Sequence, residues 1–177
     1  KKVERATLTG GNSTYMNAVE NEIVAGRSLR PQDYKEFASV ILLDEELAKS
    51  LFDSPEAAVN QVISVNEFSY RVIGVYTSNE AKTAKAFGIG GLPITTNISL
   101  AANFNTDEIS NIVFRVNDTS LTQTLGPELA RKLTEIAGLQ QGEYQVADAT
   151  AAFQEVQQLF GFMTTVISAI AGISLFV

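Results

Sequence analysis

The chain has 177 residues, of which 45% are hydrophobic and 19% charged, and its 13 Lys and Arg against 20 Asp and Glu give a net charge of -7. That length suits about one domain of roughly 150 residues, and the acidic balance argues against nucleic acid as a partner. The sequence contains neither cysteine nor histidine. Disulfides, thiol nucleophiles, His-based zinc sites and Ser-His-Asp catalysis are therefore excluded.

The first elements are short. Val3–Thr9 is predicted as a strand that Gly10 and Gly11 end, and residues 12–14 supply caps for a short helix through Val19. The next elements follow in this order: an extended run Glu22–Val24, a turn at Ala25–Arg27, a helical turn over Gln32–Phe37 that Pro31 begins, a strand Ser39–Leu43, and a helix Glu45–Phe52 capped by Asp44.

A hairpin is expected in the middle of the chain. The alternating runs Gln61–Val65 and Phe68–Tyr76 flank the dipeptide Asn66-Glu67, and a two-residue connection of this kind indicates a β-hairpin. Residues 78–91 are first polar and then glycine-rich, which predicts a mobile loop. The glycines lack the Lys-Ser/Thr of a phosphate cradle.

The second half begins with a predicted strand over Asn111–Val116. A helix over Leu121–Ala137 is expected next, opened by Asp118, ended by Gly138 and broken near Gly126-Pro127. Glu143–Ala147 is predicted as the last strand. Because strands and helices mix without strict βαβ alternation, the predicted fold class is α+β.

The C-terminal segment has the composition of a membrane span. After Glu155 no residue is charged, and residues 160–177 as a helix reach about 27 Å, close to the roughly 30 Å of a bilayer core. A buried core helix is the alternative. The last basic residues, Arg131 and Lys132, lie far upstream, so residues 1–155 are placed on the extracytoplasmic side.

The same terminal helix, capped by Thr150, carries a heptad seam that begins with Phe153, Val156 and Phe160. This seam predicts a stiff rod that joins the folded part to the membrane. The carboxylate cluster at 44–46 is interpreted as an ordinary helix start, and neither this cluster nor the pair at 107–108 is assigned a metal or acid/base role. No catalytic, cofactor-binding or metal-binding residue is predicted, and an enzyme is the least favoured class.

Several segments together carry a family resemblance over roughly residues 12–76. The chain resembles the MacB-type extracytoplasmic core domain of ABC-transporter permeases in the FtsX-like family. The segments that carry it are Glu22–Arg27 with its Gly26-Arg27 turn, Asp33 six residues later, Ser39–Leu43, Ala48, Leu51-Phe52 and Phe68–Val75.

The resemblance implies a two-lobed α+β domain hung between the first two of four membrane helices of a bacterial plasma-membrane protein. It places a porter-like lobe at 1–25 and 107–150, an inserted second lobe at 26–106, and the start of the second transmembrane span at 151–177. Gly26, Arg27 and Asp33 are interpreted as structural, the last two as a local ion pair.

The resemblance also implies partners: a permease homodimer, a cytoplasmic ABC ATPase on a separate domain or subunit, an adaptor protein and the lipid bilayer. Such a domain transmits the ATPase cycle across the membrane to drive export of peptides or antibiotics, with Phe153, Val156 and Phe160 in the transmission helix. The alternative is a cell-surface binding module held by a single C-terminal anchor.

Overall fold

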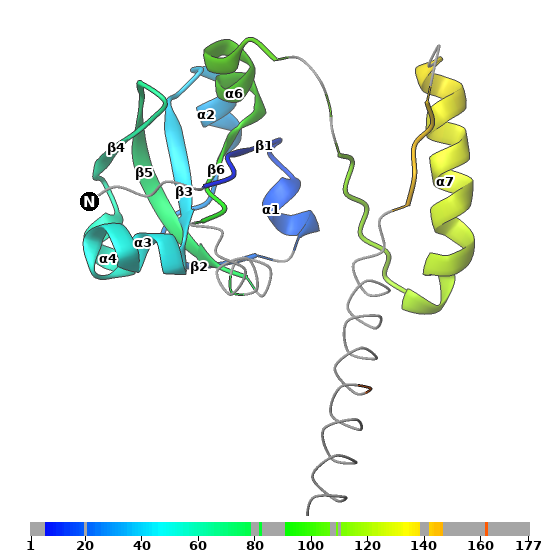
Figure 1. Cartoon of the computed structure of the whole chain (residues 1–177), viewed down its shortest axis with the longest axis horizontal. Coiled ribbons are helices and arrows are strands. Elements are labelled where there is room, and N and C mark those ends of the chain that lie inside the picture. The colour runs from blue at the N-terminus through cyan, green and yellow to red at the C-terminus, as the bar shows by residue number, and fades with distance from the viewer. Residues whose placement is uncertain are drawn as a thin grey trace, which may run out of the picture. The chain divides into compact units, whose positions relative to one another are not determined.

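A computed structural model describes residues 6–19, 21–78, 82, 91–106, 109, 111–138, 142–146 and 162. The chain forms two compact units, one ending at Arg115 and the other beginning at Val116 (Figure 1). The first unit contains the β-sheet and the second contains the longest described helix.

A mixed six-stranded sheet forms the first unit. Its order is β1-β6-β3-β5-β2, and β4 pairs with β5 beside β2. The β1–β6 and β3–β5 pairs are parallel and the other pairs are antiparallel. The strands are β1 (Thr9–Gly11), β2 (Glu22–Gly26), β3 (Val40–Asp44), β4 (Val62–Val65), β5 (Phe68–Thr77) and β6 (Ile94–Thr96).

The long strand β5 has two partners along one of its sides. Phe68–Arg71 pair with β4, and Gly74–Thr77 pair with β2. The register against β3 shifts at Gly74, so Val72 and Val75 point to the same face although they are three positions apart in the chain. A side chain at Gly74 would place its Cβ 2.4 Å from the Arg27 carbonyl oxygen, so this junction requires glycine.

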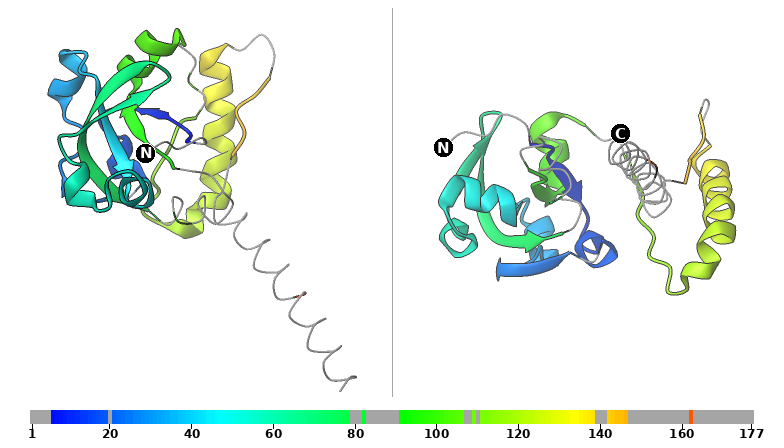
Figure 2. Two further views of the ribbon diagram at one scale, coloured as in Figure 1. Left: turned by 60° about the vertical axis from the view of Figure 1, so that its left-hand side comes forward. Right: turned by 60° about the horizontal axis from the view of Figure 1, so that its bottom comes forward.

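Helices cover both faces of the sheet, and each face has its own apolar cluster. Leu47, Ala48 and Ala58 pack with Ile41 and Val72 on one face, whereas Met16 packs with Ile73 on the other. The helices are α1 (Tyr15–Ala18), α2 (Pro31–Lys35), α3 (Glu45–Phe52), α4 (Pro55–Ala58) and α6 (Asn97–Phe104). Figures 1 and 2 show α3 and α4 side by side, and α6 beside β1 and β6.

The cap predicted at Asp44 is confirmed, and it does more than start a helix. One carboxylate oxygen of the buried Asp44 accepts from the Leu47 N–H at 2.9 Å and begins α3. The other accepts from the Leu92 N–H at 2.8 Å. The same side chain therefore fixes the backbone that enters β6.

The predicted hairpin is also confirmed. Asn66 and Glu67 connect β4 to β5, with φ angles of 45° and 76°. Two successive residues with positive φ are typical of the type I′ turn, whose twist matches that of paired strands.

The second unit contains a short 3-10 turn, Thr119–Leu121, and then α7 (Thr122–Ala137). Gly138, with a φ of 58°, ends the helix as predicted. The Tyr144 N–H donates to Thr134 Oγ1 at 2.9 Å, which holds residues 142–146 against α7. The predicted break at Gly126-Pro127 is wrong, because α7 runs through Pro127 without interruption. Pro127 removes one N–H donor from the helix, and the remaining backbone hydrogen bonds of α7 keep the helix continuous at that position.

Four other expectations about strands are wrong. Gly10 and Gly11 belong to β1 instead of ending it, and Gly26 belongs to β2 instead of a turn. Asn111–Val116 is not a strand, nor are the described residues 142–146. Ile112 and Phe114 in the first segment are 42% and 51% exposed. Alternating hydrophobic residues indicate a strand only where a partner strand is present.

The structure adds three elements that the sequence reasoning missed, α4, β6 and α6. Thr96 caps α6 through its hydroxyl, which accepts from the Ser99 N–H at 3.1 Å. Other predictions lie outside the described residues: the start of the first strand, most of the loop at 78–91, Thr150, and the terminal helix apart from Phe162. Among the residues that the structure describes, no helix is both long and apolar enough to cross a bilayer.

Candidate functional site

The candidate site begins where β2 ends. Gly26 has a φ of 73°, and a Cβ there would lie 2.4 Å from the Ile73 carbonyl oxygen. Glycine therefore lets the chain leave β2 in contact with β5. The Arg27 N–H then donates to the Ile73 carbonyl at 2.9 Å, which fixes the position from which the Arg27 side chain projects.

Arg27 and Asp33 form a two-pronged ion pair. Arg27 Nη1 donates to Asp33 Oδ2 at 2.7 Å, and Nη2 donates to Oδ1 at 2.8 Å. The Arg30 N–H adds a third donor to Asp33 Oδ2 at 2.8 Å. Since Pro31 begins α2 and Asp33 lies in its first turn, this carboxylate also stabilises the start of that helix.

The electrostatics of the pair favour its charged form. The side chain of Asp33 is 7% exposed and that of Arg27 is 32% exposed. The hydrogen bonds from Arg27 lower the pKa of Asp33 against the opposing effect of burial, and the Arg30 N–H lowers it further. The same hydrogen bonds raise the pKa of Arg27. Both groups are therefore ionised at neutral pH.

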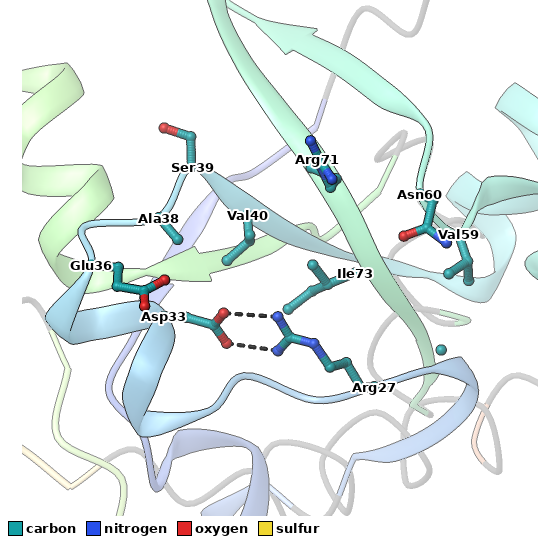
Figure 3. Close-up of a pocket in the computed structure, with 11 residues that line it drawn as sticks. Arg27, Asp33, Glu36, Ala38, Ser39, Val40, Val59, Asn60, Arg71 and Ile73 are labelled. Carbon is teal, nitrogen blue, oxygen red and sulfur yellow. Dashed lines mark hydrogen bonds and ion pairs between the residues drawn. The ribbon is translucent and has the colours of Figure 1, made fainter.

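A pocket of about 630 Å³ lies beside this pair. Figure 3 shows Arg27 and Asp33 joined near its centre, Glu36 on one side, and Asn60 and Val59 on the other. Its polar and apolar lining comes from β2, α2, β3, β5 and the end of α4, and includes Arg27, Asp33, Glu36, Asn60, Arg71 and Ile73.

A neighbouring tyrosine ties α2 to the sheet. The Tyr34 hydroxyl donates to the Gly11 carbonyl at 2.8 Å, and burial raises the pKa of Tyr34 to about 12. The hydroxyl therefore stays protonated at neutral pH and keeps this hydrogen bond. Tyr34 acts as a tether between α2 and β1.

The hydrogen bonds of Asp33 are made within the site itself. The Asp33 carboxylate is fully engaged by Arg27 and Arg30, which leaves it a poor general base. Within the described ranges, no three acidic residues come together in a group that would hold a metal ion.

The structure brings together three of the residues singled out from the sequence, Gly26, Arg27 and Asp33. Phe153, Val156 and Phe160 lie outside the described residues, and their role stays a prediction. Sequence reasoning missed Arg71 and Asn60 as neighbours of Arg27. Arg71 is the outward residue between the buried Tyr70 and Val72, so strand alternation signals its exposure, but only the fold places it next to β2.

Fold and site together define a mixed α+β domain with an internal ion pair and an adjoining pocket. Comparison with known proteins identifies the family to which this domain belongs. The model of the MacB-like periplasmic core domain family matches residues 1–132, and the chain belongs to this family. The family's description places such a domain outside the cytoplasm.

Individual relatives agree. The uncharacterized ABC transporter permease YknZ of Bacillus subtilis is 27% identical over 172 residues, which cover 97% of this chain and 42% of that protein. The macrolide export ATP-binding/permease protein MacB of Mannheimia succiniciproducens is 26% identical, with coverage of 96% and 26%. The chain thus spans less than half the length of these relatives.

A solved structure shows the same fold. The crystal structure of the extracellular domain of the noncanonic ABC-type transporter YknZ from Gram-positive bacteria matches with a TM-score of 0.63 and 22% identity. The match covers 84% of this chain and 74% of that one. The predicted α+β class and the predicted family are therefore confirmed.

Proposed function

We propose that this chain is the extracytoplasmic domain of an ABC transporter permease that transmits an ATPase cycle across the membrane to drive export of peptides or antibiotics. The family match over residues 1–132 carries this proposal. The names of the relatives supply the transport class: one is an ABC transporter permease, and another is a macrolide export protein.

The features of the first unit suit a part that passes on motion without deforming. Its sheet has an apolar cluster on each face, and a two-pronged ion pair ties the end of β2 to the start of α2. Packed cores of this kind move as bodies because they resist continuous deformation. The proposal assigns Gly26, Arg27 and Asp33 to this internal stiffness.

The proposal includes the two-lobe division at 1–25 with 107–150 and at 26–106, and a helix at 151–177 that enters the bilayer. Phe153, Val156 and Phe160 would form the seam of that helix against a second permease copy. A cytoplasmic ABC ATPase would drive the cycle, and an adaptor protein would continue the path outward. In this scheme the domain itself has no catalytic role.

Cysteine cross-linking in the intact transporter tests this assignment. Phe153→Cys and Val156→Cys should each cross-link between two copies, with a yield that changes at least twofold between ATP-bound and nucleotide-free states. Gln158→Cys is the matched control, because a residue two positions after Val156 lies on the opposite side of a heptad-patterned helix.

Two results would contradict the proposal. The first is cross-linking at Phe153 and Val156 that is the same with and without ATP, which would show that the ATPase cycle is not transmitted along this helix. The second is an unchanged susceptibility to macrolides and peptide antibiotics when the intact protein and its ATPase are deleted and restored. A surface-binding module with a single anchor predicts both of these results.

A further inference from the structure

The pocket beside Arg27 and Asp33 has properties that internal stiffness does not require. Its volume of about 630 Å³ falls in the range of small-molecule sites, roughly 300 to 1,000 Å³. It lies where β5 changes partner from β4 to β2, so residues from both sides of that junction reach it.

Arg71 is a cation of this pocket that has no side-chain partner among the described residues. Arg27 already donates to both oxygens of Asp33. Among the residues that the structure describes, none accepts a hydrogen bond from the Arg71 guanidinium or forms an ion pair with it. Its backbone is fixed, since the Arg71 N–H donates to the Ser39 carbonyl at 2.9 Å. A guanidinium on a rigid strand presents a planar pair of donors that matches a carboxylate.

A second polar side chain lies across the pocket from α2. Asn60 is exposed, with a positive φ of 67° and an N–H that donates to the Val72 carbonyl at 2.8 Å. Figure 3 shows its side chain on the same side of the pocket as Val59 and opposite Glu36. Its amide supplies a further donor for an anionic group.

Apart from Ser39 and Gly26, the remaining lining residues are apolar. Val40 and Ile73 are 7% and 6% exposed and line the pocket together with Ala38 and Val59. An apolar group placed there would lose contact with water at little polar cost. The pocket therefore combines an apolar surface with the Arg71 guanidinium.

The charges of the lining select the kind of anion. Its charged residues are two arginines and two carboxylates, Arg27, Arg71, Asp33 and Glu36, so the formal charge is zero. A phosphate with two charges would meet Glu36 and Asp33 as well as Arg71. A single carboxylate needs one free cation, which is what the pocket provides.

We propose that this pocket binds a ligand with one carboxylate on an apolar body, the carboxylate held by Arg71 and the apolar body packed on Val40 and Ile73. A free small acid and the C-terminal residue of a peptide share this chemistry. The proposal is separate from transport: binding needs no ATP, so it can fail while the export assignment holds.

The test uses the full chain in detergent micelles. N-acetyl-leucine and N-acetyl-leucinamide are titrated into it separately, and calorimetry or NMR measures the affinity for each. The two probes differ only in the charged carboxylate. The acid should bind at least about tenfold more tightly, because a hydrogen bond to a charged group contributes that much or more. A tetrapeptide acid ending in leucine then separates the two sources: tighter binding indicates a peptide terminus, and equal binding indicates a free acid.

Substitution locates the contact. Arg71→Gln should reduce the affinity for the acid to that for the amide and leave the amide unchanged. Arg131→Gln on α7 is the control with the same change in charge, and it should alter neither. Arg71→Lys keeps the charge but loses the fork, so it should retain intermediate affinity. Equal affinity for acid and amide, an Arg71→Gln variant that binds the acid normally, or no binding of either probe would each overturn the proposal.

Discussion

Replacing Asp33 by Asn tests the ion pair that fixes the end of β2. The substitution keeps the size of the side chain but removes its charge. It weakens two hydrogen bonds from Arg27, of 2.7 and 2.8 Å, and one from the Arg30 N–H. The Arg27 guanidinium is then left beside a neutral group.

The magnitude follows from the burial of the two partners. Breaking a fully buried ion pair costs about 3 to 5 kcal/mol, and an exposed pair contributes about 0 to 1 kcal/mol. Asp33 is almost fully covered, but Arg27 is 32% exposed, so water replaces part of what Arg27 loses. We therefore expect Asp33→Asn to lower the free energy of unfolding by about 2 kcal/mol at neutral pH.

Urea unfolding followed by tyrosine fluorescence measures this. The chain has five tyrosines and no tryptophan, and Tyr70 and Tyr76 are buried in the sheet, so the signal reports largely on the first unit. With a slope of about 1 to 2 kcal/mol per molar urea, the midpoint should fall by about 1 to 2 M.

The pH dependence has a definite sign. The pKa of Asp33 in the folded protein lies below its usual value of 3.8. Its contribution to stability is therefore present above about pH 4 and is lost as the pH falls through the folded pKa. The difference between the wild type and Asp33→Asn should shrink in that acidic range.

A double-mutant cycle with Arg27→Gln isolates the pair, and its coupling energy should exceed about 1 kcal/mol. Lys49→Ala is the control, since it removes an exposed ion pair with Glu45 and should leave the midpoint unchanged. The reasoning is refuted if Asp33→Asn changes stability no more than this control, or if its effect is the same at pH 3 and pH 7.

Three further substitutions test other parts of the first unit by the same unfolding assay. Gly74→Ala should destabilise by about 3 kcal/mol, because its Cβ would lie 2.4 Å from the Arg27 carbonyl oxygen; a normal midpoint would refute the tight junction. Asp44→Ala should lower the free energy of unfolding by about 2 to 3 kcal/mol, since it removes a helix cap and leaves the Leu92 N–H without its acceptor. A loss no larger than that of an ordinary helix cap, about 1 kcal/mol, would show that the hydrogen bond to Leu92 does not contribute to stability. Glu67→Gly should stabilise by about 0.5 kcal/mol, because glycine adopts its φ of 76° without strain; a loss of stability would contradict the turn assignment.

The sequence predicts elements whose signals are local. Asp44 followed by two acidic residues marks the start of α3, and the two-residue connection at Asn66 marks the β4–β5 hairpin. Each prediction depends on chemistry within a few residues, and each is confirmed. The predicted strand at Asn111–Val116 is wrong because alternation reports the side chains and carries no information about a partner strand.

Glycines show that sequence patterns can also miss residues that do lie in strands. From the sequence, Gly10 and Gly11 are predicted to end the first strand and Gly26 to lie in a turn, yet all three lie in strands. A Cβ at Gly10 would approach Leu100 of α6, and one at Gly26 would approach β5. Close packing by distant elements explains Gly10 and Gly26, and one-dimensional patterns do not reveal such neighbours.

One part of the candidate site could be predicted from the sequence, and the other part could not. The ion pair between Arg27 and Asp33 spans six residues, and it is predicted together with the family resemblance that these residues carry. The pocket requires Asn60 and Arg71 to lie beside Arg27, and that depends on β5 crossing from β4 to β2. Pairings between segments more than thirty residues apart lie beyond a motif-based reading.

The parallel pairing of β1 with β6 determines how the first unit would respond to tension. Thr9 pairs with Ile94 and Gly11 with Thr96, and the Thr9 N–H donates to the Pro93 carbonyl at 2.9 Å. A pull on the chain that enters β1, against a pull on the chain that leaves β6, draws two parallel strands past each other. All their cross-strand bonds then share the load, whereas the β4–β5 hairpin pulled from its open end would unzip one pair at a time. A mechanical load applied through β1 and β6 would therefore be resisted by shear of parallel strands, which is stronger than the unzipping of a hairpin.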